Sequence, residues 1–323
     1  MPYRNAAGTL ERAAASVLAS DRVDELIAID DNDGAGDPSG LPDDPRVTRL
    51  CTGGIGIANA LEAGRRATGA RFLGRMDADD RCVAERFGPQ LAALETDSSL
   101  GAVGSLASPF TDEGEVGEGF AHYIRWQNTL LSPRDHALAL YIESPLCHPS
   151  TVLRASALER IGGYRHGPFP EDYDLWLRLH DAGFRLSKVN TPGVHWRQSR
   201  GQATFTDPRY SRDAFANLKA PYLARYVKAK LAGRELVVWG AGATGKRAMR
   251  RLEPHGLVAA RWLDIDPNKI GRTARGAPIV AMNDLPEDSF VLVLLGARGA
   301  RAEALRHLKT RGLKHGPDFI AGA

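Results

Sequence analysis

The sequence predicts an α/β fold with a mostly parallel sheet, followed by a second, smaller α/β unit. Short apolar runs that end in acidic or glycine-rich loops alternate with segments of helical spacing over residues 10–110. The same alternation starts again at Glu235, after a polar and then helical stretch. Such alternation is typical of α/β domains, whose ligands sit beyond the carboxyl ends of the strands.

The composition is that of an ordinary globular protein. Of 323 residues, 43% are hydrophobic and 25% are charged, which is enough to build a core. Lys and Arg number 42 against 39 Asp and Glu, so the net charge of +3 gives no reason to expect nucleic acid as a partner. No apolar run reaches membrane-spanning length, and no signal peptide is recognisable. Cys51, Cys82 and Cys147 lack metal-ligand spacing, and we expect reduced thiols in a cytoplasmic protein.

The expected elements follow from these patterns. In chain order they are a helix over 10–20, a strand over 25–31, a helix over 54–70 after a glycine-rich entry, a strand over 71–80, a helix over 86–97 and a strand over 100–110. Residues 148–167 indicate a strand, a helix and a Gly-Gly stop, and residues 170–183 indicate a helix that begins with Pro and acids. We expect a first domain over 1–204, a helical linker over 205–233 and a second domain over 234–323.

The stretch "MDADD" places Asp77, Asp79 and Asp80 at the end of an expected strand. Neighbouring carboxylates repel one another unless solvent or a divalent cation separates them. Mg²⁺ and Mn²⁺ prefer hard oxygen ligands, often one or two carboxylates plus substrate phosphates. The stretch therefore suits a metal–diphosphate, although an isolated D-x-D is more often a solvated acidic turn.

Two further acidic pairs stand at element ends. Asp30 and Asp31 close the strand "ELIAIDD", where carboxylates could accept hydrogen bonds from a base or a ribose, or could simply cap a turn. Glu171 and Asp172 begin the helix "EDYDLWLRL", where they could favour the helix dipole or supply a general base.

Taken together, five segments in this order resemble the family 2 glycosyltransferases with the GT-A fold. They are the P-x-x-N of Pro2 and Asn5, "ELIAIDD", "MDADD", "HPSTVLRASALERIGGY" and "PEDYDLWLRL", and the resemblance covers about residues 1–200. It implies an inverting transferase that moves a sugar from a nucleoside-diphosphate sugar, a UDP- or dTDP-sugar, to a glycan or lipid-linked acceptor with Mg²⁺ or Mn²⁺. Bacterial cell-surface polysaccharide synthesis, at the cytoplasmic side and with peripheral membrane association, fits this class.

The resemblance also implies roles for individual residues. Asp172 is the catalytic base, with Glu171 as neighbour or substitute, and one base suits a single displacement in which an acceptor hydroxyl loses its proton. The resemblance further implies that Asp31, with Asp30 beside it, contacts the nucleotide base, and that Pro2 and Asn5 line the nucleotide cleft. It implies that Asp77 and Asp79, with Asp80 adjacent, bind the metal and the sugar. It also implies that Arg197 contacts the diphosphate and that His148 lies on the acceptor side. A structural His148 is as well supported as a functional one, and Arg197 could be an ordinary surface arginine. Arg4, Glu62 and the loop "NDGAGDPSG" depart from the family pattern, which weakens the base and ribose contacts more than catalysis.

In the family, an apolar strand runs directly into the P-x-x-N, and Met1 stands where its last residue falls. We therefore expect the first strand to be missing from the chain as written, with an open apolar slot between two other strands. The corresponding hypothesis is a true start upstream of Met1. A catalytically weak nucleotide-sugar-binding protein is the alternative to an active transferase.

The segment 235–252 carries Gly240, Gly242 and Gly245 in a G-x-G-x-x-G between an expected strand and an expected helix, and Asp264 ends the next strand. This spacing is typical of a small Rossmann-like domain with a nucleotide site at the helix start. A nucleotide or nucleotide-sugar site, a structural or docking role, and NAD(P) redox chemistry remain open for this domain.

Overall fold

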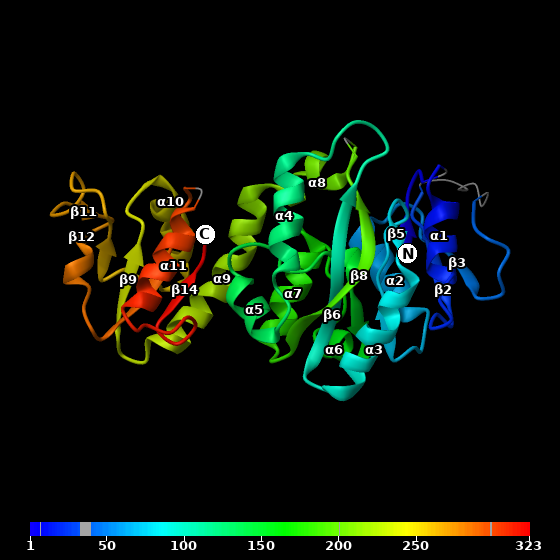
Figure 1. Cartoon of the computed structure of the whole chain (residues 1–323), viewed down its shortest axis with the longest axis horizontal. Helices are drawn as coiled ribbons and strands as arrows, with labels where there is room; N and C mark the ends of the chain where they lie inside the picture. The colour runs from blue at the N-terminus through cyan, green and yellow to red at the C-terminus, as the bar shows by residue number, and fades with distance from the viewer. Residues whose placement is uncertain (7, 33–39, 200, 298) are drawn as a thin grey trace. The chain divides into compact units, whose positions relative to one another are not determined.

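The computed structural model describes residues 1–6, 8–32, 40–199, 201–297 and 299–323 (Figure 1). The expected loop over 32–40 falls almost wholly outside the described residues. The chain divides into two compact units, the first made of residues 1–137 and 144–210 and the second of residues 138–143 and 211–323. The helix over 212–231, expected in a linker, is grouped with the second unit.

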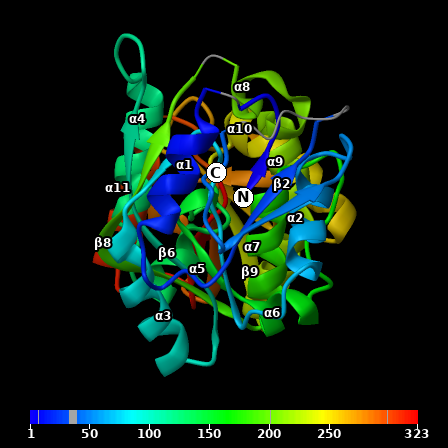
Figure 2. The same cartoon turned by 90° about the vertical axis from the view of Figure 1, so that its right-hand side faces the viewer.

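The first unit begins with a parallel three-stranded sheet. Its strands are β1 (Pro2–Tyr3), β2 (Leu26–Asp30) and β3 (Val47–Cys51), in the order β1-β2-β3. The helices α1 (Leu10–Leu18) and α2 (Ile57–Arg66) both contact β2 (Figure 2). Apolar residues of α1 recur at helical spacing and are buried, as amphipathic packing on a sheet requires.

A second, five-stranded sheet lies in the same unit. It consists of β4 (Phe72–Gly74), β7 (Val152–Arg154), β6 (Leu100–Phe110), β8 (Arg185–Arg197) and β5 (Arg81–Cys82), in that order. Only β6 and β8 pair in parallel, and the other three pairs are antiparallel. This sheet is therefore mixed, whereas we expected mostly parallel pairing. The sequence also gave no sign that β8 would be a continuous strand, because polar residues and Pro192 interrupt its apolar pattern.

Helices and 3-10 turns complete the first unit. They are η1 (Ala84–Arg86), α3 (Phe87–Thr96), α4 (Glu118–Asn128), α5 (Pro133–Ala139), η2 (His148–Ser150), α6 (Ala155–Arg160), α7 (Glu171–Asp181), α8 (Ala203–Thr206) and η3 (Pro208–Tyr210). The helix α7 is the most buried of the sequence-expected helices, with Tyr173, Leu175 and Trp176 fully enclosed. This burial fixes the position of the acids at its first turn.

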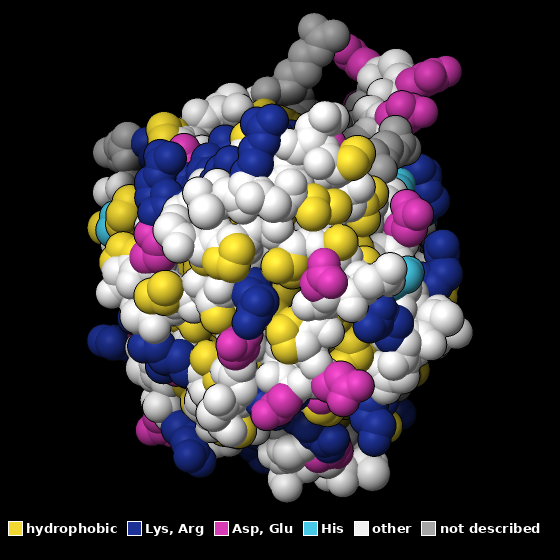
Figure 3. Space-filling view, turned by 90° about the vertical axis from the view of Figure 1, so that its left-hand side faces the viewer, with side chains coloured by type: hydrophobic (Ala, Val, Ile, Leu, Met, Phe, Trp, Pro, Cys, Tyr) yellow, Lys and Arg dark blue, Asp and Glu magenta, His cyan; other side chains and the backbone are white. Residues whose placement is uncertain are grey.

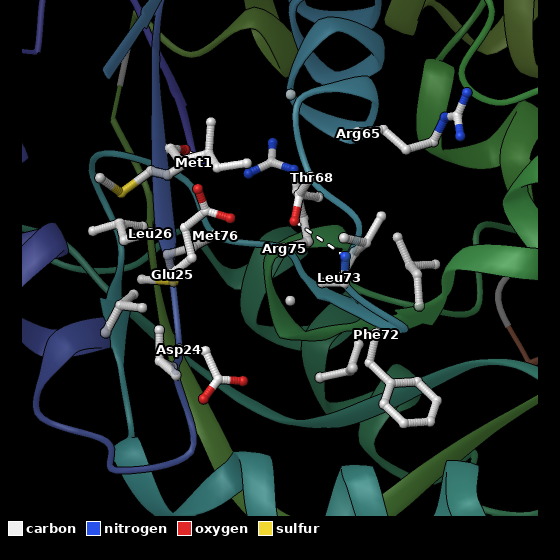
Figure 4. Close-up of a pocket in the computed structure, with 18 of the residues that line it drawn as sticks. Met1, Asp24, Glu25, Leu26, Arg65, Thr68, Phe72, Leu73, Arg75 and Met76 are labelled. Carbon is white, nitrogen blue, oxygen red and sulfur yellow. Dashed lines mark hydrogen bonds between the residues drawn. The ribbon is translucent and has the colours of Figure 1, made fainter. Parts of the chain in front are cut away.

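A cavity of about 420 Å³ separates the two sheets of the first unit. The close-up shows Met1, Asp24, Glu25 and Leu26 along one side and Phe72, Leu73 and Arg75 along the other (Figure 4). β1 pairs with β2 only at Ile29 and Asp30, so the first half of β2 lacks a strand partner on that edge among the described residues. The cavity lies along this part of β2, and a missing first strand stays a prediction.

The second unit is built on a six-stranded sheet of order β11-β12-β10-β9-β13-β14. Its elements are α9 (Arg212–Leu231), β9 (Glu235–Trp239), α10 (Ala243–Leu252), η4 (Glu253–His255), β10 (Arg261–Leu263), β11 (Thr273–Ala274), β12 (Ala277–Val280), η5 (Met282–Asp284), β13 (Ser289–Val293), α11 (Ala300–Thr310) and β14 (Phe319–Ala321). All its strand pairs are parallel except β11 with β12. The strands of this sheet begin at Glu235, where the sequence predicts the second α/β unit.

The two faces of β13 contact different helices. Val291 and Val293 belong to a core cluster with Ala304 and Leu308 of α11. The interposed Leu292 points to the side where Leu223 of α9 packs, since both approach Gly322.

The face shown in Figure 3 mixes Lys and Arg with Asp, Glu and scattered apolar side chains.

Candidate active site

The acids of "MDADD" lie between β4 and β5. Asp77 is partly exposed, and its Oδ1 accepts a hydrogen bond from Arg75 Nη2 over 2.6 Å. Asp80 is buried, its Oδ1 accepts from the backbone N–H of Arg197 over 2.8 Å, and its Oδ2 has no partner among the described residues. Asp79 keeps 32% of its side chain exposed and makes only a loose 3.9 Å contact with Arg197 Nη1.

Burial and neighbouring negative charges raise the pKa of both Asp79 and Asp80. Burial raises the pKa of Asp79 to about 6, and the negative charge of Asp77 adds to the rise. Burial and both neighbouring acids also raise the pKa of Asp80 well above its usual range. No group of three His, Cys, Asp or Glu side chains among the described residues has the geometry of a complete metal site. One or two of the acids could instead share a cation with a ligand's phosphates.

Glu171 and Asp172 begin α7, where the partial positive charge of the helix start favours carboxylates. Glu171 is buried, and Tyr210 Oη donates a 2.6 Å hydrogen bond to its Oε2. Asp172 is half-buried, and its Oδ1 accepts from the backbone N–H of Tyr173 over 2.7 Å. Asp172 is thus the more accessible member of the pair.

The same environment sets the protonation of Asp172. Burial raises the pKa of Asp172 to about 8, and the negative charge of Glu171 contributes to this shift. A carboxyl with a pKa close to the working pH is suited to accept a proton from a hydroxyl, because both of its protonation states are then populated.

Arg197, at the end of β8, reaches the D-x-D because β8 pairs with β5. Its guanidinium, however, is engaged by Asp112, with Nε and Nη2 at 2.7 and 2.6 Å from Oδ2. Asp112 was not expected from the sequence at all, since no motif surrounds it. Contact between Arg197 and a diphosphate stays a prediction that requires the guanidinium to exchange or share its partner.

The end of β2 carries Asp30 and Asp31, both buried. Asp31 accepts hydrogen bonds from Thr52 Oγ1 and from the backbone N–H groups of Ile55 and Gly56, at 2.8 to 3.0 Å. Asp31 therefore orders the turn that precedes α2, in accordance with the alternative of a structural aspartate.

Asp30 is paired with Arg49 Nη2 at 2.8 Å and with Asn32 Nδ2 at 2.6 Å. Nearby, Pro2 lies in β1, and the backbone N–H of Asn5 donates to Asn32 Oδ1 over 3.1 Å. The structure thus brings Pro2 and Asn5 to the end of β2. Nucleotide contacts by Pro2, Asn5, Asp30 and Asp31 stay predictions.

His148 is buried in η2, and its Nε2 lies 3.1 Å from Tyr164 Oη. Its ring also meets the edge of Trp176. Burial lowers the pKa of His148 well below its usual range, and nearby Arg75 adds to this effect. These contacts describe a neutral structural histidine, which was one of the two roles the sequence left open.

The glycine-rich turn of the second unit shows specific steric requirements. A Cβ on Gly245 would lie 1.9 Å from the carbonyl oxygen of Gly240, and a Cβ on Gly240 would lie 2.5 Å from that of Leu294. Gly242, the N-cap of α10, has open space around it. Asp264 accepts from the backbone N–H of Ala241 and from Lys269, so it orders the same turn. A nucleotide at this turn stays a prediction.

Sequence reasoning missed two residues at the acid clusters of the first unit. Arg75 stands two positions before Asp77, and a cation so close to three acids was a signal that could have been used. Tyr210 lies in a polar stretch that we expected to be a linker, and only the fold brings it to Glu171.

The first unit is thus an α/β unit with acids at strand ends and a further carboxylate at a helix start, an arrangement that agrees with the GT-A fold expected from the sequence. Residues 1–162 match the family model described as "Glycosyl transferase family 2". Because this match covers half of the chain, the chain belongs to glycosyl transferase family 2.

Curated relatives agree with this family. The chain is 29% identical over 140 residues to the amylovoran biosynthesis glycosyltransferase AmsE of Erwinia amylovora, which covers 43% of this chain and 49% of that protein. It is 32% identical over 117 residues to the putative glycosyltransferase EpsE of Bacillus subtilis, which covers 35% and 38% respectively. The chain thus spans about half the length of the curated relatives it matches, or less.

Two solved structures are also similar. The mannosyltransferase PcManGT from Pyrobaculum calidifontis, solved with GDP-Man and Mn²⁺, has a TM-score of 0.47 at 17% identity over 79% of this chain and 72% of its own. S. aureus TarS 1–349, solved with UDP-GlcNAc, has a TM-score of 0.48 at 11% identity over 70% and 71%. Scores this low support no inference about ligands.

No helix among the described residues is long and apolar enough to cross a membrane.

Proposed function

We propose that this chain is an inverting, metal-dependent glycosyltransferase. It moves a sugar from a nucleoside-diphosphate sugar to a glycan or lipid-linked acceptor. The observation that carries the proposal is the presence in one unit of two distinct acid clusters, Asp77–Asp80 and Glu171–Asp172, each with a carboxyl whose pKa is raised by burial. Membership of glycosyl transferase family 2 supports the reaction class.

The donor set of the first cluster fits a divalent cation. Asp79 is the most accessible of its hard oxygen ligands, and Asp80 Oδ2 is buried without a partner among the described residues. Asp79, with Asp77 and Asp80 beside it, would hold Mg²⁺ or Mn²⁺. When bound, such an ion stabilises the leaving diphosphate as a Lewis acid.

In the proposed reaction the acceptor hydroxyl attacks the anomeric carbon, and the bond to the diphosphate breaks. Asp172 takes the hydroxyl proton on its Oδ2, because Oδ1 already accepts from the backbone. Glu171 stays hydrogen-bonded to Tyr210 and places a negative charge beside the base. One displacement with one base inverts the anomeric configuration.

Uridine and thymidine diphosphate sugars are the proposed donors. A role in bacterial cell-surface polysaccharide synthesis is supported by the similarity to AmsE, an amylovoran biosynthesis glycosyltransferase. The acceptor class rests on the family resemblance. A cytoplasmic location with peripheral membrane association belongs to the same proposal.

The experiment that tests this function is a donor panel with and without Mn²⁺. Binding of a UDP- or dTDP-sugar would raise the thermal midpoint of the protein according to its affinity. Release of nucleoside diphosphate, measured in the same samples, separates an active transferase from a protein that only binds. We expect one donor to give both a metal-dependent shift and metal-dependent release. A thermal shift without any release of nucleoside diphosphate, with acceptor extracts added, would favour the catalytically weak binding protein. The absence of both the shift and the release would contradict the proposal.

A further inference from the structure

The last third of the chain carries an excess of positive charge. Residues 211–323 contain 20 Lys and Arg against 10 Asp and Glu, whereas residues 1–210 contain 22 Lys and Arg against 29 Asp and Glu. The small net charge of the whole chain therefore combines an acidic first part with a basic second part. Such an asymmetry indicates an anionic partner for the basic part, provided that its cations gather on one surface.

The helix α10 presents cations along one side. Lys246, Arg247 and Arg250 are exposed and stand three and four positions apart, while Met249 and Leu252 on the other side of the helix are buried. None of these three cations forms a salt bridge among the described residues. Their charge is therefore available to a partner outside the chain.

The helix α9 extends this surface. It packs against α10, where Arg251 donates to Asp213 Oδ1 over 2.6 Å and to Asn217 Oδ1 over 2.7 Å. Farther along α9, the exposed Lys228 lies beside Gly256, because a Cβ on Gly256 would stand 2.6 Å from Lys228 Nζ. We call four exposed cations of α9 and α10 the basic face: Lys228, Lys246, Arg247 and Arg250.

The acids that these two helices and the following turn contribute are neutralised by other cations. Asp213 at the start of α9 is paired with Arg251, and Glu253 after α10 is paired with Arg275. The cations of the basic face therefore keep their charge.

The opposite side of the sheet is mixed in charge. Met282 and Leu285 pack in one cluster with Ala304 and Leu308 of α11, so the connection that precedes β13 lies on that side. This connection and α11 together hold four acids among their cations: Asp284, Glu287, Asp288 and Glu303.

An apolar side chain stands close to the basic face. Val258, two residues after Gly256, is 72% exposed. The interface of an anionic bilayer accepts both a cation cluster and an aliphatic side chain. Base stacking on a nucleic acid uses aromatic side chains instead, and the exposed large apolar residues described in the second unit, Val258 and Ile265, are both aliphatic. These features favour a phospholipid surface over a nucleic acid.

We propose that the basic face docks the second unit on an anionic phospholipid surface. The cations contact the headgroup phosphates, and Val258 enters the interface beside them. The inference deepens the proposed function and rests on it for the lipid-linked acceptor, which such a surface would present. Each Lys or Arg near an anionic leaflet strengthens binding by about fivefold.

The test is co-sedimentation of the full chain with vesicles, in the absence of donor and metal. One set of vesicles is phosphatidylcholine alone, and the other is an equal mixture of phosphatidylcholine and phosphatidylglycerol. The test variant removes the three cations of α10: Lys246→Gln, Arg247→Gln and Arg250→Gln. The matched control removes the same charge from exposed positions on and just after α11: Arg306→Gln, Lys309→Gln and Lys314→Gln. Thermal unfolding checks that each variant is folded.

We expect the original protein to bind the mixed vesicles but not those of phosphatidylcholine alone, and we expect added salt to weaken this binding by screening. The α10 variant should bind about a hundredfold more weakly, because three contributions of about fivefold multiply. The control should stay within about threefold of the original protein, since charges farther from the bilayer than a Debye length are screened. If the α10 variant does not fold, Arg250→Gln alone decides, with an expected loss of about fivefold.

Unchanged vesicle binding in the α10 variant, or in Arg250→Gln where that variant decides, would overturn the proposal. An equal loss in the control would overturn it as well, because net charge rather than the basic face would then drive binding. Absent binding to the mixed vesicles would do the same, and tighter binding to duplex DNA at equal phosphate and salt concentration would assign the face to nucleic acid instead. Failure of the proposed function is distinct, since it is seen as absent donor turnover, and vesicle binding is measured without donor.

Discussion

The raised pKa of Asp172 predicts how transfer depends on pH. With a pKa of about 8, roughly a tenth of Asp172 is ionised at pH 7 and roughly nine tenths at pH 9. If ionised Asp172 accepts the proton, kcat/KM should rise about tenfold between these two pH values. The carboxyl pKa lies above its unfolded value, so the folded protein holds this proton more tightly.

Substitution of Glu171 by Gln provides the perturbation. The amide oxygen can still accept from Tyr210 Oη, while the negative charge next to Asp172 is gone. Because that charge raises the pKa of Asp172, its removal should move the rising limb to lower pH by about one unit. The assay is donor turnover in the presence of Mg²⁺ from pH 6 to pH 10.

Asp181→Asn is the matched control, because Asp181 is exposed at the opposite end of the same helix. This variant should keep the original profile. A flat profile between pH 7 and 9 in the original protein would refute the reasoning, and so would a limb that moves to higher pH in Glu171→Gln.

The linkage between protonation and folding gives a stability prediction for the same residue. The stability that protonated Asp172 contributes is fully present below its unfolded pKa and is lost as the pH rises through about 8. Asp172→Asn should therefore gain stability relative to the original protein between pH 4 and pH 8, by up to about 5 kcal/mol, because the pKa is raised from 3.8 to about 8 and each unit corresponds to about 1.4 kcal/mol. Urea unfolding at pH 5 and pH 8 measures this, and an equal difference at the two pH values would contradict it.

Three other outcomes follow from the contacts described. Asp79→Ala should abolish metal-dependent turnover, which a donor-release assay with Mn²⁺ measures. The metal affinity of the original protein should weaken as the pH falls through about 6, because the proton on Asp79 then competes; calorimetry with Mn²⁺ alone measures this affinity, and an affinity independent of pH would contradict the prediction. Tyr210→Phe should lower the free energy of unfolding by about 1 to 3 kcal/mol, since it leaves a buried carboxyl of Glu171 without its donor, and an unchanged urea midpoint would show that the bond contributes little. Gly245→Ala should lower the thermal midpoint because its Cβ would meet a carbonyl oxygen at 1.9 Å, whereas Gly242→Ala, in open space, should not.

Much of the fold could be predicted because its signals are local. The strand over 25–31 corresponds to β2 (Leu26–Asp30), and the strand over 100–110 coincides with β6. The helix over 170–183 corresponds to α7 (Glu171–Asp181), since Pro170 and the acids mark its start and Gly183 follows its end. In these segments apolar periodicity and terminal residues indicate the same element.

The parts that could not be predicted depend on long-range pairing. β8 forms along a polar sequence because β6 lies beside it, and no local pattern reveals such a partner. Within α9, a helix of 20 residues, Pro221 lies in the interior, where proline is normally unfavourable, and the helix continues through it. Tertiary packing overrides local preference in both cases.

The candidate site also divides into residues that the sequence predicts and residues that only the fold reveals. Asp79 and Asp172 could be singled out from spacing and order, because acids at strand ends and helix starts are visible in the sequence. The partners that set their chemistry could not, since Tyr210 comes from 39 positions away from Glu171. For Asp31 the sequence left a base contact and a turn-capping role open, because the same pattern is typical of both, and the structure shows the hydrogen bonds of a turn-capping carboxylate.

The most direct test of the central claim is turnover by Asp172→Asn at saturating donor and metal. The amide can keep the bond from the backbone N–H of Tyr173 but cannot accept the hydroxyl proton. We predict that donor binding, measured by calorimetry, stays within about threefold of the original protein while kcat falls by about a hundredfold or more. Near-normal turnover in this variant would show that Asp172 is not the base.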